Sequence, residues 1–432
     1  MYKYEIEGGF PIKGTVRASG NKNAALPCIA ATLLTSAPVV LRNIPDIEDV
    51  QVMFDILRFL GATVERRGRN VWQVTAPDGL RSEVPAGQAN RIRAAILFAG
   101  PLLARTGRAV LAPPGGDVIG RRRLDTHFLA LEELGAKVEI NGQYTFSAAR
   151  LIGADIFLDE ASVTATENAI MSAALAEGTT ILRNAASEPH VQDLCLMINA
   201  MGGKVSGIGS NILSIEGSQQ LHGADFAIGP DFMEIGSFIG LAAVTRGELT
   251  IENVQPNDLR MMRIAFARLG IQWQLQGTTL HVPAGQAMAV NPDLGGQIPK
   301  IDDAPWPGFP PDLTSIITVI ATQVEGTVLV HEKMFESRMF FVDKLIGMGA
   351  RIILCDPHRA VVSGPSKLNG TTLVSPDVRA GMAMLIAAMC AQGTSTIHNV
   401  YQIERGYECL TERLTALGAH IKRLPDTGSG GF

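Results

Sequence analysis

A sixfold internal repeat is the feature of this sequence that most limits how the chain can fold. A Leu/Met-Gly pair followed by a strand-like stretch recurs at a spacing of about 70 residues. The glycines of these pairs are Gly61, Gly135, Gly202, Gly270, Gly349 and Gly418. Upstream of each pair, a small residue opens a β-rich stretch, at Ala37, Gly107, Gly178, Gly247, Gly326 and Gly393. Two phrases that stay in register six times indicate six copies of one supersecondary unit.

Each repeat is predicted to contain two helices and two strands. An apolar helix precedes the small residue, as in 94–104 and 381–391, and a helix that is apolar on nearly every face belongs in an interior. Glycine is expected to end this helix. A strand follows, then an amphipathic helix with apolar residues at i, i+3 and i+4, and then an alternating strand. The repeat is therefore α/β, with one buried and one half-exposed helix.

Six such units are expected to group as two similar domains of three repeats each. The boundary is predicted near residues 227–229, just before the fourth buried helix. Two similar lobes would leave a cleft between them, and clefts between domains commonly hold small molecules. A single solenoid is the alternative, although helices this apolar favour enclosure.

Composition excludes several classes of function. A net charge of −5 lacks the basic excess of a general nucleic-acid binder, so no nucleic-acid partner is expected. No run of about 18 apolar residues is available to span a membrane, and the first residues lack the apolar core of a secretory signal. The five cysteines show no CxxC spacing, so neither a metal site nor a disulfide framework is expected. This cysteine usage favours a cytoplasmic location.

Polar residues stand at the predicted starts of the six buried helices. They are Lys22, Asn23, Arg91, Arg93, Glu167, Asn168, Asp231, Glu234, Asp312, Asp377 and Arg379. A helix N-terminus carries partial positive charge and free N–H groups, so it attracts anions. Ordinary capping explains an acid such as Asp231 and is an alternative for Asn168. Lys22, Arg93 and Arg379 oppose the dipole, however, and this favours a bound anion.

The segment 113–127, PPGGDVIGRRRLDTH, is a second candidate site. Its two glycines permit a backbone that folds over a ligand, so a mobile loop is predicted. Its charged residues and histidine are Asp117, Arg121, Arg122, Arg123, Asp125 and His127. A solvated basic loop is the alternative, but the corresponding segments of the other repeats are much plainer. With no HExxH, GxSxG or GxxxxGK[ST] pattern, the residues alone indicate a two-lobed α/β enzyme for an anionic, phosphorylated ligand.

Seven segments resemble the enolpyruvyl transferases. They are GNKNAALP (20–27), GGDVIGRRRLDTH (115–127), SVTATENAI (162–170), FPPDL (309–313), MFESRMFFVDKL (334–345), SPDVRAG (375–381) and IERGYECL (403–410). The similarity extends from residue 1 to about residue 424. It implies two inside-out α/β barrel domains, each of three repeats with buried helices, and a first strand that crosses to the second lobe. The expected domains are 22–229 and 1–21 with 230–432, with a cleft between them.

The resemblance implies a reaction as well as a fold. The enolpyruvyl group of phosphoenolpyruvate would be transferred to the 3-hydroxyl of UDP-N-acetylglucosamine with release of phosphate, the first committed step of peptidoglycan synthesis. No cofactor and no metal is implied, and the enzyme is expected to be a cytoplasmic monomer or weak homo-oligomer. The alternatives are an enolpyruvyl transferase for a free nucleotide or shikimate 3-phosphate, and a paralogue that binds the sugar nucleotide without turnover.

The resemblance also implies roles for individual residues. Asp117 would be the general acid and Asp312 the general base. Phosphoenolpyruvate would be held by Lys22, Arg122 and Arg405, with Arg379 nearby and Arg93 bridging toward the nucleotide. The uracil would be contacted by Arg122, Arg123, Leu124, Asp125 and Thr126, the diphosphate by Ser162, Val163 and Thr164, and the sugar by Asn23, Asp312 and Met334.

Three residues depart from the usual pattern of the family. Asp117 stands where many members have cysteine, Arg123 replaces a proline beside the uracil, and Thr164 replaces a glycine near the diphosphate. Fosfomycin opens its epoxide on the thiolate of cysteine members. A carboxylate is a poorer nucleophile, so the chain is expected to be insensitive to the drug. Because a free aspartic acid is ionised at pH 7, the bound substrates would have to keep Asp117 protonated.

Overall fold

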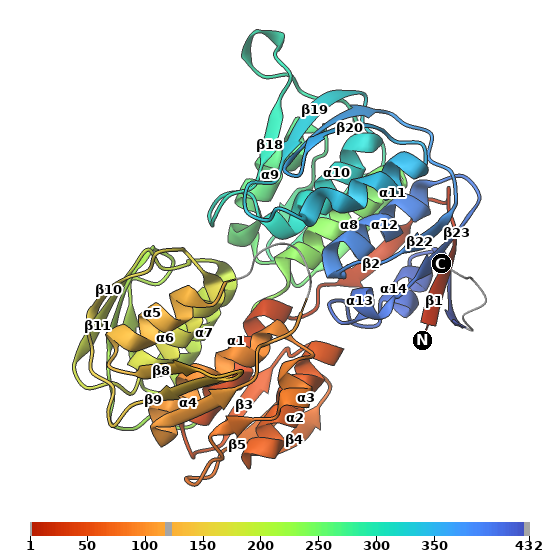
Figure 1. Cartoon of the computed structure of the whole chain (residues 1–432). Helices are drawn as coiled ribbons and strands as arrows, with labels where there is room; N and C mark the ends of the chain where they lie inside the picture. Colours follow the sequence, from red (N-terminus) through yellow and green to blue (C-terminus); the bar gives the residue numbers. More distant parts are fainter. Residues whose placement is uncertain (1, 117–122, 427–432) are drawn as a thin grey trace. The chain divides into compact units, whose positions relative to one another are not determined.

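The computed structural model describes residues 2–116 and 123–426, which divide into two compact units (Figure 1). One unit holds residues 2–19 and 230–426, and the other holds 20–116 and 123–229. Each unit has a hydrophobic core of its own. Asp117, Arg121 and Arg122 lie outside the described residues.

In the unit of residues 20–229, a buried helical segment, a strand, a second helix and a pair of strands follow one another three times. The first repeat is α1 (Lys22–Ala31), η1 (Thr32–Leu34), β3 (Val39–Arg42), α2 (Glu48–Leu60), β4 (Thr63–Gly68) and β5 (Val71–Thr75). The second is β6 (Glu83–Val84), α3 (Ala86–Ala89), η2 (Arg93–Phe98), α4 (Ala99–Thr106), β7 (Arg108–Leu111), α5 (Asp125–Glu133), β8 (Lys137–Ile140) and β9 (Tyr144–Ser147). The third is β10 (Asp155–Phe157), α6 (Val163–Ala173), β11 (Thr179–Arg183), α7 (Pro189–Ala200), β12 (Lys204–Ser206) and β13 (Ile212–Glu216), and β14 (Asp225–Ala227) follows it.

The other unit begins with β1 (Tyr2–Glu7) and β2 (Lys13–Arg17) and resumes after β14. Its first repeat is α8 (Phe232–Val244), β15 (Glu248–Glu252), η3 (Pro256–Leu259), α9 (Arg260–Arg268), β16 (Gln274–Gln276) and β17 (Thr279–Val282), followed by η4 (Leu294–Gly296). The second is β18 (Lys300–Asp302), η5 (Pro311–Leu313), α10 (Thr314–Thr322), β19 (Gly326–His331), η6 (Arg338–Phe341), α11 (Val342–Gly347), β20 (Arg351–Asp356) and β21 (Arg359–Gly364). The third is β22 (Thr372–Val374), α12 (Val378–Cys390), β23 (Thr394–His398), α13 (Tyr401–Glu404), α14 (Leu410–Ala416) and β24 (His420–Pro425).

Within the described residues the strands form six four-stranded sheets of one design. Their strand orders are β14-β3-β5-β4, β6-β7-β9-β8, β10-β11-β13-β12, β2-β15-β17-β16, β18-β19-β21-β20 and β22-β23-β1-β24. In every sheet the first pair is parallel and the next two pairs are antiparallel. A parallel pair needs a crossover connection, and the buried helical segment supplies it in four of the six sheets.

The other two sheets exchange their edge strands. β2 leads directly into α1 but pairs in parallel with β15, and β14 leads into α8 but pairs in parallel with β3. The chain therefore changes unit immediately before α1 and immediately before α8, two of the helices whose starts carry predicted site residues.

The first strand of the chain completes the last sheet. β1 lies between β23 and β24 and pairs antiparallel with both, in the position that β5, β9, β13, β17 and β21 hold in the other sheets. Its Tyr4 and Ile6 side chains are fully buried in the core of that unit. The sixth repeat is thus built from the two ends of the chain.

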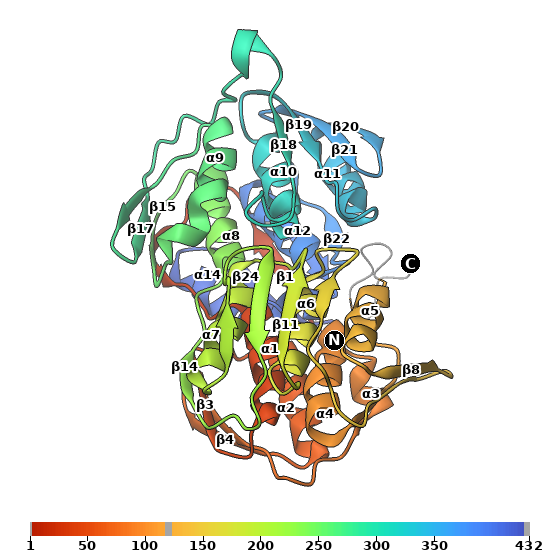
Figure 2. The ribbon, with the colours of Figure 1, turned by 90° about the vertical axis from the view of Figure 1, so that its left-hand side faces the viewer.

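The predicted buried helices are confirmed. All residues of α8 and α10 are buried, and α12 is buried except for Cys390 at its end. Each of these three helices contacts the other two, and Figures 1 and 2 show them side by side inside their strands. In a solenoid a repeat contacts only its neighbours in sequence, so contact between the first and third repeats favours enclosure. None of the helices in 2–116 and 123–426 is long and apolar enough to cross a membrane.

One predicted helix is divided. The apolar stretch 94–104 forms the 3₁₀ segment η2 and then α4, with Pro101 in the first turn of α4. Proline lacks the N–H that a continuous α-helix needs and clashes with the carbonyl four residues earlier. The spacing of the apolar residues gives no sign of this break, so the prediction of one continuous helix over 94–104 is wrong.

The position of β1 leads to a test of stability. Ile6→Ala would leave a cavity in the sheet core, and we expect a loss of about 2–4 kcal/mol in the free energy of unfolding of that unit. Glu7→Ala on the same strand is the control, because its ion pair with His420 is exposed and such pairs contribute about 1 kcal/mol or less. Urea unfolding measures both, and equal losses would contradict the assignment of β1 to the core.

Candidate active site

An aspartate between two arginines is the centre of the candidate site in the unit of residues 230–426. Asp312 lies in η5, just before the buried helix α10. Its Oδ1 accepts a hydrogen bond of 2.9 Å from Arg338 Nη2, and its Oδ2 accepts one of 3.1 Å from Arg379 Nε. The Asp312 side chain is 25% exposed, whereas those of Arg338 and Arg379 are 3% and 6% exposed. Each carboxylate oxygen has a second lone pair, so Asp312 can still accept from a ligand.

Arg379 is fixed from several directions at the start of α12. Its Nη1 donates to Tyr407 Oη at 3.1 Å, and its backbone N–H donates to the capping carboxylate of Asp377 at 2.8 Å. Burial alone would lower the pKa of the Arg379 guanidinium, but the neighbouring Tyr407, Asp312 and Asp231 outweigh burial and raise it. The guanidinium is therefore a permanent charge in a defined orientation beside Asp312.

The other predicted residues of this unit have separate environments. Arg405 is buried at the end of α13, where its Nη1 donates to Gln402 Oε1 at 3.3 Å. The backbone N–H of Met334 donates to Glu332 Oε1 at 3.1 Å, so the carbonyl of Met334 is the backbone group available to a ligand. Glu234 is not free to bind one, because Arg413 and the Ser19 N–H engage its carboxylate.

Lys22 begins α1 in the other unit, and its partner is a carboxylate of the protein. Its Nζ lies 2.5 Å from Asp49 Oδ2, and both side chains are largely buried. Asn21 caps the helix by accepting from the backbone N–H groups of Asn23 and Ala24. Asp49 therefore balances the charge of Lys22. From its place at a helix start alone, the predicted partner of this lysine was a bound anion. Sequence reasoning missed Asp49, whose only signal was an acid at the start of an amphipathic helix.

Arg93 and the start of the 113–127 segment pack against their own unit. Arg93 Nη2 donates to the backbone oxygen of Arg123 at 3.0 Å. The Gly115 N–H donates to Ala89 O at 3.2 Å, and a Cβ on Gly115 would lie 1.8 Å from Asn90 O. Glycine at position 115 is thus required by a close approach to the backbone of Asn90. Arg91 at this end forms an ion pair with Glu48.

The residues expected to contact the nucleotide surround the start of α6. Thr126 Oγ1 donates to Asp159 Oδ1 at 2.7 Å, Leu124 is buried, and Arg123 pairs with the exposed Asp125. Ser162 precedes α6 without a side-chain capping bond. The first N–H groups of α6, from Val163 onward, therefore lack the side-chain acceptor that α1, α8 and α12 have, which leaves them suited to an anion.

His127 ties α5 to α6 in a neutral hydrogen-bond network. Its Nε2 lies 3.0 Å from Thr164 Oγ1, and its Nδ1 lies 2.9 Å from Asn168 Nδ2. Burial, assisted by Arg93, lowers the pKa of His127 to about 3, so the ring is uncharged at neutral pH. Asn168 lies in the second turn of α6 and also bonds to Gly100 N and Ile96 O, so it does not cap the helix.

Glu167, next to Asn168, also lies inside α6 rather than at its tip. Its side chain is buried, and burial, together with the nearby Glu188, raises the pKa of Glu167 well above its usual range. The prediction of a polar group exposed at the start of this helix is therefore wrong for Glu167.

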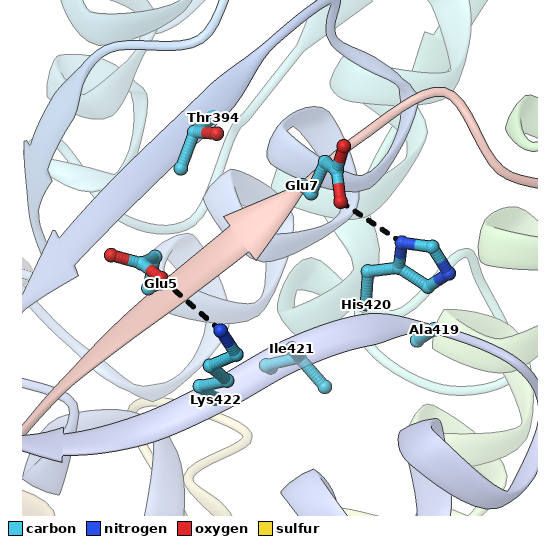
Figure 3. A pocket seen from close by; sticks show the side chains of 7 residues that line it. All are labelled: Glu5, Glu7, Thr394, Ala419, His420, Ile421 and Lys422. Carbon is cyan, nitrogen blue, oxygen red and sulfur yellow. Dashed lines mark hydrogen bonds and ion pairs between the residues drawn. The ribbon is translucent and has the colours of Figure 1, made fainter.

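No predicted site residue is among the residues that line the pocket in Figure 3. Side chains of β1, β23 and β24 line it, namely Glu5, Glu7, Thr394, Ala419, His420, Ile421 and Lys422. Cross-strand ion pairs join Glu7 to His420 at 3.0 Å and Glu5 to Lys422 at 3.9 Å. These ion pairs use the charges of the pocket to join neighbouring strands. The candidate site residues are therefore those around Asp312 in this unit and, separately, those around Lys22 in the other unit.

Comparison with known proteins gives consistent matches. The family model of EPSP synthase (3-phosphoshikimate 1-carboxyvinyltransferase) matches residues 6–414. The UDP-N-acetylglucosamine 1-carboxyvinyltransferase of Treponema denticola is 69% identical over 98% of this chain and 99% of its own, and that of Bacteroides thetaiotaomicron is 49% identical over 98% and 100%.

Solved structures support the same fold. The enolpyruvyl transferase NikO from Streptomyces tendae has a TM-score of 0.86 at 26% identity, covering 98% of this chain and 99% of its own. An EPSP synthase from Acinetobacter baumannii has a TM-score of 0.74 at 18% identity, over 98% and 100% of the two chains.

The bond between Thr164 and His127 leads to a stability test. Thr164→Val removes the hydroxyl and leaves a buried ring nitrogen unpaired, so the free energy of unfolding should fall by about 1–2 kcal/mol. Thr415→Val is the matched control, because its hydroxyl makes an exposed bond to a helix carbonyl, and surface substitutions usually change stability by about 0.5 kcal/mol or less. Equal effects of the two substitutions in urea unfolding would show that Thr164 does not support His127.

Proposed function

Because this chain belongs to the EPSP synthase family of enolpyruvyl transferases, we propose that it transfers the enolpyruvyl group of phosphoenolpyruvate to the 3-hydroxyl of UDP-N-acetylglucosamine and releases phosphate. The observation that carries this acceptor is the 49–69% identity, over nearly the whole chain, to relatives named UDP-N-acetylglucosamine 1-carboxyvinyltransferase. The chain is accordingly an enzyme, a transferase.

The proposed reaction needs a proton acceptor for the sugar hydroxyl, and Asp312 fits this role. Its carboxylate is partly exposed and is oriented on both oxygens by buried arginines. A base held at a fixed position within hydrogen-bond reach of the hydroxyl speeds proton transfer. Arg338 and Arg379 also supply fixed positive charge, which stabilises anionic groups as charge develops in the transition state.

The proposed binding residues follow the resemblance. Phosphoenolpyruvate is assigned to Lys22, Arg122 and Arg405, with Arg379 nearby and Arg93 bridging toward the nucleotide. The sugar nucleotide is assigned to Asn23, residues 122–126 and 162–164, Asp312 and Met334. The start of α6, with no side-chain cap at Ser162, supports the diphosphate assignment. Asp117, the proposed general acid, and Arg122 lie outside the described residues.

The proposal extends to architecture and cellular role. We propose that the two units are inside-out α/β barrels with the active site in a cleft between them, as the similarity to enolpyruvyl transferase structures supports. The enzyme would be a cytoplasmic monomer or weak homo-oligomer that commits its substrate to peptidoglycan, and so contributes to cell-wall formation, cell shape and division.

Phosphate release with separate acceptors tests the proposed function. We expect turnover of phosphoenolpyruvate with UDP-N-acetylglucosamine and none with UMP or shikimate 3-phosphate. Asp312→Asn should lower kcat by about 10²–10⁴-fold because it removes the proton acceptor. Asp356→Asn, a substitution of an acid that pairs with Arg359, is the matched control and should retain turnover. Turnover with UMP alone would contradict the acceptor, and an active Asp312→Asn enzyme would contradict the base.

The response to fosfomycin tests the assignment of Asp117. With the drug and UDP-N-acetylglucosamine present, we expect no covalent adduct and no time-dependent inactivation, because a carboxylate attacks the epoxide far more slowly than a thiolate does. Asp117→Cys should become sensitive and gain one adduct by intact-protein mass spectrometry. A drug adduct on the unsubstituted enzyme would contradict the prediction.

A further inference from the structure

Four of the six repeats place an asparagine directly after the strand that follows the buried helix. These residues are Asn43, Asn184, Asn253 and Asn399, all with φ between 55° and 62°. Each donates its side-chain N–H to a backbone oxygen just after the neighbouring edge strand. The acceptors are Ile228 O at 3.0 Å, Leu158 O at 2.9 Å, Ala18 O at 3.0 Å and Ser375 O at 2.9 Å. The amide thus joins the ends of two parallel strands in each of these repeats.

Glu332 holds this position in the fifth repeat. The phrase EGTVLVHE (325–332) aligns with EGTTILRN (177–184), so Glu332 replaces the asparagine. Its neighbouring edge strand is β18, which is followed by Asp303, and the Asp303 N–H donates to His331 O at 3.3 Å. An ionised carboxylate only accepts hydrogen bonds, whereas a protonated carboxyl group can also donate one, as the asparagines do.

Glu332 and Asp303 form a buried carboxyl pair. Their side chains contact each other, and they are 0% and 1% exposed. Glu332 Oε2 and Asp303 Oδ2 make no hydrogen bond among the described residues, and the Thr314 hydroxyl and Arg338 Nε lie beside Glu332. One proton shared between the two oxygens would satisfy both. Burial raises the pKa of Glu332 to about 8, the hydrogen bond with Asp303 acts in the same direction, and Arg338 opposes it.

The remaining contacts of Glu332 lead to the candidate base. Its Oε1 accepts from the backbone N–H groups of Met334 and Phe335, each at 3.1 Å. Its Oε2 lies 3.5 Å from Arg338 Nε, and Arg338 Nη2 donates to Asp312 Oδ1. Glu332 thus contacts both the Met334 backbone and the arginine that orients Asp312, without itself contacting Asp312.

We propose that Glu332, held protonated against Asp303, is a positioning residue that fixes the Met334 backbone and Arg338, and through Arg338 the carboxylate of Asp312. The inference rests on the proposed role of Asp312 as base. The titratable and charged groups that face Glu332 are Asp303 after β18, Arg338 of η6, and His358, whose Nδ1 meets the Glu332 backbone oxygen at 2.7 Å. Helix α10 contributes only the hydroxyl of Thr314 beside it.

Ionisation of Glu332 would change this arrangement. It would place two like charges side by side in the interior and draw Arg338 toward Glu332, away from Asp312. A carboxyl group whose pKa is raised in the folded state stabilises the fold at low pH. That stabilisation is lost as pH rises through the folded-state pKa. Stability should therefore fall between pH 4.5, the ordinary pKa of a glutamate, and about pH 8, and kcat should decline as pH rises through about 8.

Glu332→Gln provides the sharpest test because glutamine keeps a donor for Asp303 and an acceptor for Met334 but cannot ionise. We expect it to keep kcat within about threefold of the unsubstituted enzyme at pH 7 and to lose the part of the Tm decline that lies between pH 4.5 and about 8. Glu332→Ala should lower kcat about tenfold or more, through misplacement of Asp312, with the KM for phosphoenolpyruvate changed less than kcat. Asn253→Ala breaks the matched bond in the fourth repeat, so it should lower Tm without altering the pH profile of kcat.

Infrared spectroscopy of the free enzyme provides a readout that needs no substrate. At pH 7 the spectrum should contain the carbonyl band of a protonated carboxylic acid that Glu332→Gln lacks. Absence of that band from the difference spectrum would overturn the inference, as would a Glu332→Gln enzyme whose Tm falls between pH 4.5 and about 8 as steeply as that of the unsubstituted enzyme. A wrong acceptor in the proposed function would abolish turnover but leave the infrared band and the Tm profile as expected, so the two failures are distinguishable.

Discussion

A helix that is apolar on every face can be buried only if its polar first turn finds partners, and this constraint organises both units. Three of the buried helices meet it with a side-chain cap, from Asn21, Asp231 and Asp377. Unpaired N–H groups are costly in an interior, so the chain gathers acceptors at these ends. Basic residues at these helix ends form ion pairs with further carboxylates, as Lys22 does with Asp49 and Arg379 does with Asp312. The candidate site residues thus lie at the helix ends where burial of the helices requires polar partners.

Much of the fold could be predicted from the sequence because the repeat is local. The spacing of the small residues and the Leu/Met-Gly pairs reports helices and strands that are close in sequence, and the structure has them in each repeat. The exchange of β2 and β14 could not be read from that pattern, because either strand would satisfy the parallel edge of either sheet. The insertion of β1 between β23 and β24 is likewise a pairing of distant segments.

The candidate site was predictable in type but not in its pairings. Charge at the helix starts indicated Asp312 and Arg379, and the structure joins these two residues by a hydrogen bond. The partners Asp49 and Arg338 come from other elements, and their contacts depend on packing that no local pattern encodes. The glycines of 113–127 illustrate the converse, since Gly115 faces Asn90 of its own unit. A glycine can indicate that another group lies close to its backbone, but it does not indicate whether that group is a ligand or the protein itself.

The repeat is most informative where it is broken. An asparagine amide joins two strand ends at little electrostatic cost, and four repeats keep it. Glu332 occupies the same position, but its side chain must be protonated there, because a buried carboxylate is costly. Placing a glutamate in this interior would be unfavourable unless the neighbouring charges required it. With the proton on Glu332, the charge of Arg338 is directed to Asp312. Ionisation would place a negative charge beside Asp303 in the interior and compete for Arg338, so the arrangement that positions Asp312 depends on a single buried proton.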